Sequence, residues 1–202
     1  LNFVTHSLPQ NNDVSNLWAL HGSEGPLFVF SGHTDTVPAG PIEQWQSDPF
    51  IATERDGALY GRGAADMKSA IAAMLHAFQR FLAQHPKPHF RLGMMITSDE
   101  EGPALHGTAA LVEHLIEQDL RPDWCLIGEA SSQHQLGDAI KIGRRGSLHG
   151  ELTVQGKQGH IAYPQLADNP IHRCFKALDT LTETQWDQGN AHFTPTSFQI
   201  YH

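Results

Sequence analysis

The sequence has few cysteines, few basic residues and no long apolar run, and each shortage excludes a class of protein. Its two cysteines, Cys125 and Cys174, form no CxxC pair, which excludes a disulfide scaffold and a cysteine zinc finger. Lys and Arg total 13 against 22 Asp and Glu, for a net charge of -9, and no basic run occurs, unlike in most nucleic-acid binders. No apolar stretch approaches the roughly 20 residues of a membrane span, and no signal peptide is visible. We therefore expect a cytoplasmic protein with no nucleic-acid or membrane partner.

The length and the two ends of the chain suggest an incomplete protein. The 202 residues are 40% hydrophobic, which is enough for a packed core and corresponds to one or two domains. The chain starts with Leu1 rather than Met and ends in an apolar run, residues 197–202, with no turn after it. We expect it to be a fragment of a longer chain.

Short apolar runs alternate with helical patterns over the first two thirds of the chain. The runs at residues 27–30, 90–97 and 124–127 are bounded by turn residues, which is typical of strands buried on both faces. Apolar residues recur at helical spacing over residues 71–82 and 111–116. This alternation predicts an α/β fold, with a mostly parallel sheet and helices on both faces.

The last third of the chain has a different pattern. Alternating apolar residues at 148–154 predict a half-exposed antiparallel strand, and a final strand is expected from Ser197. Between them, Asn169 and Pro170 suit the N-cap and first position of a helix. A second domain of this size is too small to be complete. The expected domains are residues 1–145 and 146–202.

Each predicted strand of the first domain leads into a side chain that can bind a metal ion or transfer a proton. The first strand leads to His33 and Asp35, the second to Glu100 and Glu101, and the third to Glu129. Parallel strands end at one edge of a sheet, where ligands bind in open α/β folds. These side chains are therefore expected to converge. A fourth candidate is Asp66, at the start of the long predicted helix.

One imidazole among several carboxylates is typical of a zinc site. Zinc takes His nitrogen and carboxylate oxygen, and a cation relieves the repulsion that clustered carboxylates would otherwise feel. Asp35 is placed to accept the second ring N–H of His33, and a Glu beside a zinc-bound water can act as a general base. Each residue alone has a plainer interpretation: His33 as a surface histidine, Asp66 as a helix N-cap, and His160 as part of a simple glycine-rich hairpin turn.

The motifs at residues 33–38, 61–68 and 100–102 resemble those of the zinc aminoacylase and carboxypeptidase superfamily. Three further motifs, at residues 98–104, 141–147 and 159–164, are similar to the branch that removes succinate from N-succinyl-LL-2,6-diaminopimelate in lysine and cell-wall precursor synthesis. The resemblance covers nearly the whole chain. It implies a metallopeptidase-like fold with a catalytic domain, residues 1–145, and a lid and dimerisation domain, residues 146–202, both incomplete here.

The resemblance also implies a role for each candidate residue. Asp66 bridges two zinc ions, for which cobalt can substitute, and its peptide bond to Met67 is cis. His33 and Glu129 complete one zinc, Glu101 binds the other, and Glu100 is the general base. Catalysis is assisted by Asp35 and by His160, which reaches the partner subunit's site in a homodimer. The residues expected to hold the substrate are Arg144, Ser147 and Tyr163.

One departure from the family pattern keeps other hypotheses open. The family's second zinc takes a further His near the C-terminus of a longer chain, and this sequence stops before that segment. We expect a zinc-dependent amide hydrolase acting on the succinylated substrate, with residues 1–202 alone weakly active or inactive. One alternative is an acetylornithine-type deacetylase or another aminoacylase of the superfamily. The other is a non-catalytic fragment that binds at most one metal ion.

Overall fold

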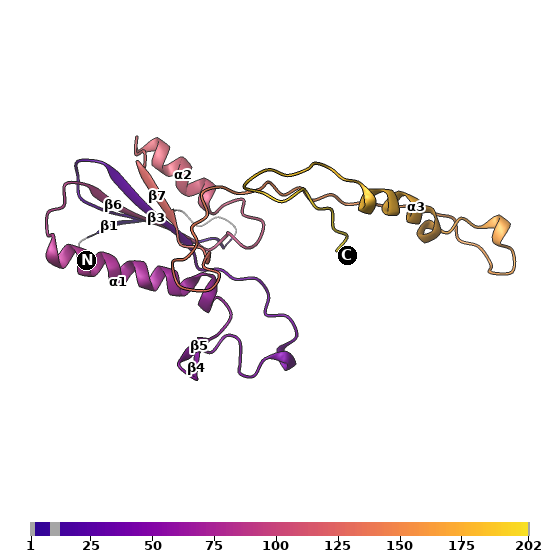
Figure 1. The fold of residues 1–202 in the computed structure, drawn as a ribbon, viewed down its shortest axis with the longest axis horizontal. Coiled ribbons are helices and arrows are strands. Elements are labelled where there is room, and N and C mark those ends of the chain that lie inside the picture. The colour runs from indigo at the N-terminus through magenta and orange to yellow at the C-terminus, as the bar shows by residue number, and fades with distance from the viewer. Residues whose placement is uncertain (1–2, 9–12, 202) are drawn as a thin grey trace. The chain divides into compact units, whose positions relative to one another are not determined.

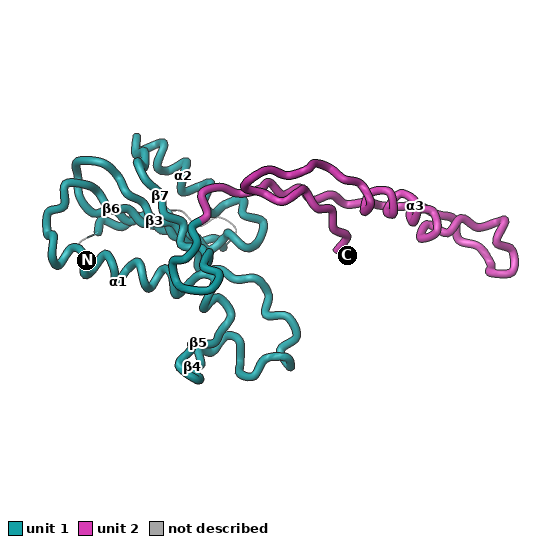
Figure 2. The backbone as a smooth tube through the Cα atoms, in the orientation of Figure 1, with its two compact units in different colours: residues 1–140 teal, residues 141–202 magenta. Residues whose placement is uncertain are grey.

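The chain divides into two compact units in a computed structural model that describes residues 3–8 and 13–201. The first unit is residues 1–140 and the second is residues 141–202 (Figure 2). The domain boundary expected at residue 145 falls within the second unit.

The first unit is built around a five-stranded mixed sheet (Figure 1). Its strand order is β1-β2-β6-β3-β7; β3 pairs in parallel with β6 and β7, whereas β2 pairs antiparallel with β1 and β6. The strands are β1 Val4–Ser7, β2 Asn16–His21, β3 Leu27–His33, β6 Arg91–Thr97 and β7 Trp124–Ile127. The three predicted strands are therefore present and mutually parallel, and the α/β class is confirmed; β1 and β2 add an antiparallel edge that the sequence analysis did not identify.

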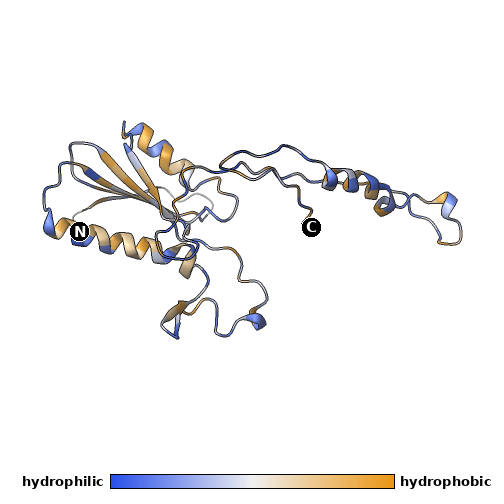
Figure 3. Ribbon diagram, viewed as in Figure 1, coloured by the Kyte–Doolittle hydropathy of each residue, from blue (hydrophilic) through white to orange (hydrophobic). Residues whose placement is uncertain are grey.

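Two helices cover opposite faces of this sheet. Helix α1, Ser69–Gln84, and helix α2, Thr108–Glu117, both coincide with predicted helices. Successive strand residues point to opposite faces, so Val29 packs with Leu111 and Leu115 of α2, while Phe30 packs with Phe78 of α1. Figure 3 shows the matching hydrophobic colours along the strands. The prediction of helices on both faces is confirmed.

The strand β7 differs from its prediction. We expected residues 124–127 to be buried on both faces, but Trp124 is 58% and Ile127 is 56% exposed. The reason is position, because β7 lies at one edge of the sheet and the two core clusters are built from other elements. A four-residue apolar run does not by itself distinguish an edge strand from a central one.

Smaller elements surround the sheet. A separate hairpin pairs β4, Thr53–Arg55, with β5, Ala58–Tyr60. The 3-10 turn η1, Ile42–Gln44, precedes this hairpin, and the π-helical turn η2, Ala64–Lys68, leads into α1. Across the described residues, no helix is both long enough and apolar enough to span a membrane.

The second unit has one long helix, α3, Pro170–Glu183, preceded by the 3-10 turn η3, Pro164–Leu166. Asn169 caps α3 as predicted, since its Oδ1 accepts a hydrogen bond from Ile171 N at 3.0 Å. The strands expected over residues 148–154 and from Ser197 are wrong: neither segment is a strand among the described residues. Alternating apolar residues form a stable strand only where partner strands pair with them.

Candidate metal centre

The centre of the candidate site is His33, the last residue of β3. Its side chain is almost fully buried, with only 1% of the residue exposed. The next residue extends the parallel pairing, because Thr34 N donates to Thr97 O across the sheet. The interpretation of His33 as an ordinary surface histidine is therefore wrong, and a buried imidazole needs polar partners on both ring nitrogens.

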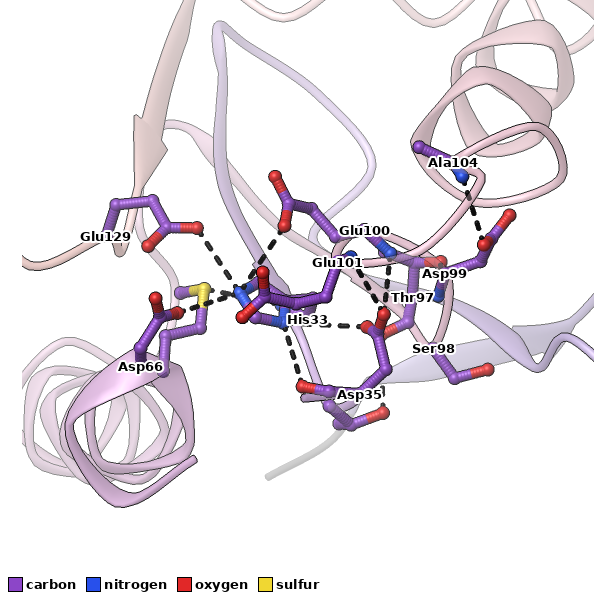
Figure 4. Close-up of polar contacts among 12 residues, drawn as sticks. His33, Asp35, Asp66, Thr97, Ser98, Asp99, Glu100, Glu101, Ala104 and Glu129 are labelled. Carbon is purple, nitrogen blue, oxygen red and sulfur yellow. Dashed lines mark hydrogen bonds and ion pairs between the residues drawn. The ribbon is translucent and has the colours of Figure 1, made fainter. Parts of the chain in front are cut away.

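Three carboxylates surround the Nε2 atom of His33 (Figure 4). The distances from His33 Nε2 are 3.0 Å to Asp66 Oδ1, 3.3 Å to Glu129 Oε1 and 3.9 Å to Glu100 Oε2. These residues come from the ends of three parallel strands and from the turn η2 that leads into α1. The sheet topology thus brings together side chains that are far apart in the sequence.

The side chain of Met67 lies next to His33. It is completely buried, its sulfur lies 3.4 Å from His33 N, and the Asp66–Met67 peptide is cis, as the resemblance implies. Its side chain fits because Gly32 and Gly128 have no Cβ: a Cβ would lie 2.8 Å and 2.7 Å, respectively, from Met67 Cε. Two strand-end glycines therefore let the segment carrying Asp66 approach the sheet closely.

Asp66 is not a helix N-cap. The residue before α1 is Lys68, with no side-chain capping bond, and Asp66 itself has non-helical angles, φ -124° and ψ 102°. Its carboxylate instead faces the imidazole of His33. The plainer interpretation of Asp66 is wrong.

Asp35 connects His33 to the Glu100–Glu101 pair. Its Oδ2 atom accepts hydrogen bonds from Glu100 N and Glu101 N, both at 2.9 Å. His33 Nδ1 lies 3.1 Å from the backbone oxygen of Asp35 and 3.5 Å from its Oδ1. The expected residue is thus beside the ring, but its carbonyl is closer than its carboxylate, which mainly anchors the backbone of the glutamate pair.

The electrostatics of the cluster reflect crowded negative charge. Burial raises the pKa of Glu129, and the nearby charges of Asp66 and Glu100 raise it further. Burial opposes protonation of His33, but the hydrogen bond to Asp35 and the charges of Glu100 and Glu129 raise its pKa overall. A bound cation would relieve this repulsion, since it stabilises the charged carboxylates and the neutral imidazole.

The donor set fits a divalent metal ion. Two groups of side chains offer ligand atoms within 4.8 Å of one another: His33 with Asp66 and Glu129, and His33 with Glu100 and Glu101. Zinc bonds of about 2.0–2.2 Å in a tetrahedron separate neighbouring ligand atoms by about 3.3–3.6 Å. The observed 3.0 Å and 3.3 Å between His33 Nε2 and its nearest carboxylate oxygens approach that spacing. The two groups share one imidazole.

The second unit holds the remaining candidates. His160 and Tyr163 lie on one turn, with ring centroids 5.8 Å apart and a hydrogen bond from Tyr163 N to His160 O. Ser147 Oγ lies 3.1 Å from His149 Nε2, and Arg144 is exposed. His160 is not part of a hairpin between regular strands, because residues 157 and 168 form only an isolated bridge.

Two residues beside the site, Met67 and Asp99, were not predicted from the sequence to have these contacts. For Met67, only the cis peptide bond before it was expected. Its burial next to the ligands depends on the glycines at positions 32 and 128, which leave room for its side chain. Asp99 was treated as part of a motif, yet it is 7% exposed and hydrogen-bonds to backbone N–H groups of the following loop. An acidic residue two positions after the end of a buried strand was the available signal.

Curated proteins that are similar to this chain include several named succinyl-diaminopimelate desuccinylase. The chain is 59% identical over 189 residues to succinyl-diaminopimelate desuccinylase of Coxiella burnetii (strain Dugway 5J108-111), covering 94% of this chain. It is 56% identical over 200 residues to the protein of the same name from Thioalkalivibrio sulfidiphilus. The chain spans about half the length of these relatives, 50% and 53% respectively.

Solved structures share the fold. Human carnosine dipeptidase 1 matches with a TM-score of 0.51 and 29% identity, over 64% of this chain and 30% of its own. The di-peptidase Dug1p of Saccharomyces cerevisiae matches with a TM-score of 0.52 and 18% identity, over 92% of this chain and 42% of its own.

The family model for Peptidase family M20/M25/M40 matches residues 29–200. That span runs from β3, which carries His33, to residue 200 in the second unit, and includes both donor groups. The matched span and the sequence identity lead to one conclusion: this chain belongs to peptidase family M20/M25/M40.

Proposed function

We propose that this chain carries the metal centre of a zinc-dependent amide hydrolase that converts N-succinyl-LL-2,6-diaminopimelate to LL-2,6-diaminopimelate and succinate. The observation that carries the proposal is the 59% identity, over 94% of the chain, to a relative named succinyl-diaminopimelate desuccinylase. The donor groups around His33 supply the chemistry that such a reaction needs.

The ligand roles come from the resemblance, and the distances around His33 support the first of them. His33, Asp66 and Glu129 would hold one zinc ion, and Asp66 and Glu101 would hold a second. The first group is supported by the short distances around His33 Nε2. The second set, Asp66 and Glu101, is not one of the two donor groups found around His33, and by the resemblance it also takes a histidine from outside residues 1–202.

Bound zinc would polarise the amide carbonyl and lower the pKa of a water molecule toward about 7. Glu100 moves the proton. Its Oε2 is farther from His33 than the oxygens of Asp66 and Glu129, and its side chain is 36% exposed, so it borders the cluster and remains accessible. Glu100 accepts a proton from water as the new C–O bond forms, and donates that proton to the nitrogen as the C–N bond breaks.

The second unit would supply substrate contacts. Arg144 suits a carboxylate of the substrate, because a guanidinium can bind one bidentately. Ser147 and Tyr163 offer hydroxyl groups, and His160 of a second copy of the chain would donate a hydrogen bond to the developing oxyanion. Donors of that kind contribute about 100- to 1,000-fold in rate.

A homodimer would bring that histidine to the site. The apolar side of α3 gives partial support, since Ile171 is 60% and Phe175 is 59% exposed. Apolar residues gathered on one helix face are typical of interaction surfaces. The dimer would form through the second unit, residues 141–202.

The test is an assay of succinate release, on the full natural protein that contains this chain and on residues 1–202 alone, with zinc measured in both. We expect the full protein to release succinate from the succinylated substrate and residues 1–202 to show little turnover. Faster release of acetate from acetylornithine would replace the proposal with the deacetylase alternative. A full protein with at most one zinc and no turnover of either substrate would favour the non-catalytic alternative.

A further inference from the structure

Asp99 lies behind the Glu100–Glu101 pair and points away from His33 (Figure 4). It is the first acidic residue after β6 and is 7% exposed. Its carboxylate is used twice: Oδ1 accepts from Ala104 N at 3.2 Å, and Oδ2 accepts from His106 N at 2.8 Å. This buried carboxylate accepts two backbone hydrogen bonds and so ties together the two ends of the loop at residues 99–106.

The loop is held at both of its ends. Asp99 N donates to Thr97 Oγ1 at 3.1 Å, and Thr97 is 2% exposed at the end of β6. Asn16 Nδ2, on the neighbouring strand β2, donates to His106 O at 2.7 Å. Both ends of the loop are thereby hydrogen-bonded to the sheet, one to β6 and the other to β2.

Two carboxylates therefore hold the glutamate pair from opposite sides. Asp35 binds the backbone N–H groups of Glu100 and Glu101 from the side of His33. Asp99 closes the loop from the far side. Removing Asp99 would leave Asp35 as the main tether of a pair whose side chains must point at His33.

We propose that Asp99 is a positioning residue, which fixes Glu100 and Glu101 relative to His33 by closing the 99–106 loop. The inference rests on the metal centre of the proposed function. It assigns no contact with metal or substrate to Asp99, because the carboxylate is occupied by the two backbone N–H groups. Residues that orient metal ligands typically change metal affinity or activity by about 10- to 100-fold when they are replaced.

The replacement Asp99→Asn tests this role with little change of volume. Asparagine keeps one acceptor oxygen, and its NH2 group would face a backbone N–H, so one of the two loop bonds is lost. The matched control is Asp138→Asn. Asp138 also accepts from three backbone N–H groups of its own loop, at residues 133–135, but lies outside both donor groups.

The experiment uses the full natural protein that contains residues 1–202, with Co²⁺ as the probe, visible absorption as the binding signal, and amide hydrogen exchange as the report on the loop. We expect Asp99→Asn to speed exchange at residues 104 and 106 and to weaken Co²⁺ binding about 10- to 100-fold. Asp138→Asn should leave Co²⁺ binding unchanged. Unchanged binding in Asp99→Asn, despite faster exchange, would overturn the inference.

A double-mutant cycle with Glu101→Gln separates positioning from a general loss of stability. If Asp99 acts through the glutamate pair, the double variant should bind Co²⁺ about as weakly as Glu101→Gln alone. Fully additive losses would overturn the inference. If Asp99→Asn fails to fold, Thr97→Val, which removes the Thr97 hydroxyl that supports Asp99, takes its place with the same criteria. A wild-type chain that binds no Co²⁺ would instead overturn the metal centre itself.

Discussion

Gly128→Ala should destabilise the chain, because the added methyl group would crowd the side chains of Phe30 and Met67 next to the metal centre. A Cβ at position 128 would lie 2.5 Å from Phe30 Cζ and 2.7 Å from Met67 Cε. Phe30 is 1% exposed and Met67 is completely buried, so neither side chain can turn outward into solvent. Overpacking of this kind costs about 1–3 kcal/mol.

That cost converts into a measurable shift in melting temperature. For a chain of this size each kcal/mol lowers Tm by roughly 2–4 °C, so the expected loss is roughly 2–12 °C. The strain also falls beside a proposed ligand, because Glu129 follows directly and its Oε1 lies 3.3 Å from His33. We therefore expect weaker zinc binding as well as a lower Tm.

Differential scanning fluorimetry of the metal-free chain measures the first effect, and a zinc titration measures the second. The matched control is Gly150→Ala, since a Cβ at position 150 would have no atom within 4 Å among those of the described chain. If the Gly128→Ala chain has the same Tm as the Gly150→Ala control, the packing argument is refuted. That result would mean that Phe30 and Met67 have room to move.

Further predictions concern other residues. Glu100→Gln should lower turnover of the full natural protein by about 100- to 10,000-fold while leaving its zinc content nearly unchanged. Glu101→Gln should instead lose zinc. Equal zinc loss from both variants in elemental analysis would contradict the two roles. Asn169→Ala should destabilise α3 by about 0.5–2 kcal/mol, because the N-cap acceptor is lost, and circular dichroism melting that matches wild type would contradict it. Backbone hydrogen bonds hold the pKa of Asp138 below its usual 3.8. Its loop should therefore be stabilised above pH 4 and lose that stabilisation as the pH falls through the lowered pKa. In an NMR pH titration, a midpoint at or above 3.8 for the amides of residues 133–135 would contradict this.

The sequence predicted the parallel centre of the fold because local patterns determine it. The apolar runs leading to His33 and to Glu100 become β3 and β6, which pair in parallel and pack on both faces. Once three parallel strands are expected, their ends must meet at one edge, so the neighbours of His33 could be anticipated without knowledge of any distance.

The errors arise where the structure depends on neighbours rather than on local pattern. The run at residues 124–127 forms a strand, but its burial depends on its place at the sheet edge. The alternation at residues 148–154 predicts a strand that the described chain does not form. Likewise, spacing placed Asp35 beside His33 but could not decide whether its carbonyl or its carboxylate would be nearer the ring.

The ligands gathered at His33 come from segments that are widely separated along the chain, so the cluster exists only after β3, β6 and β7 have assembled. An unfolded chain offers the same side chains one at a time, with no common centre. A metal ion that binds the cluster therefore favours the native state by mass action, in proportion to how far its concentration exceeds its dissociation constant. For this chain, binding of the ion and folding are therefore coupled, so tighter binding of the ion also increases the free energy of unfolding.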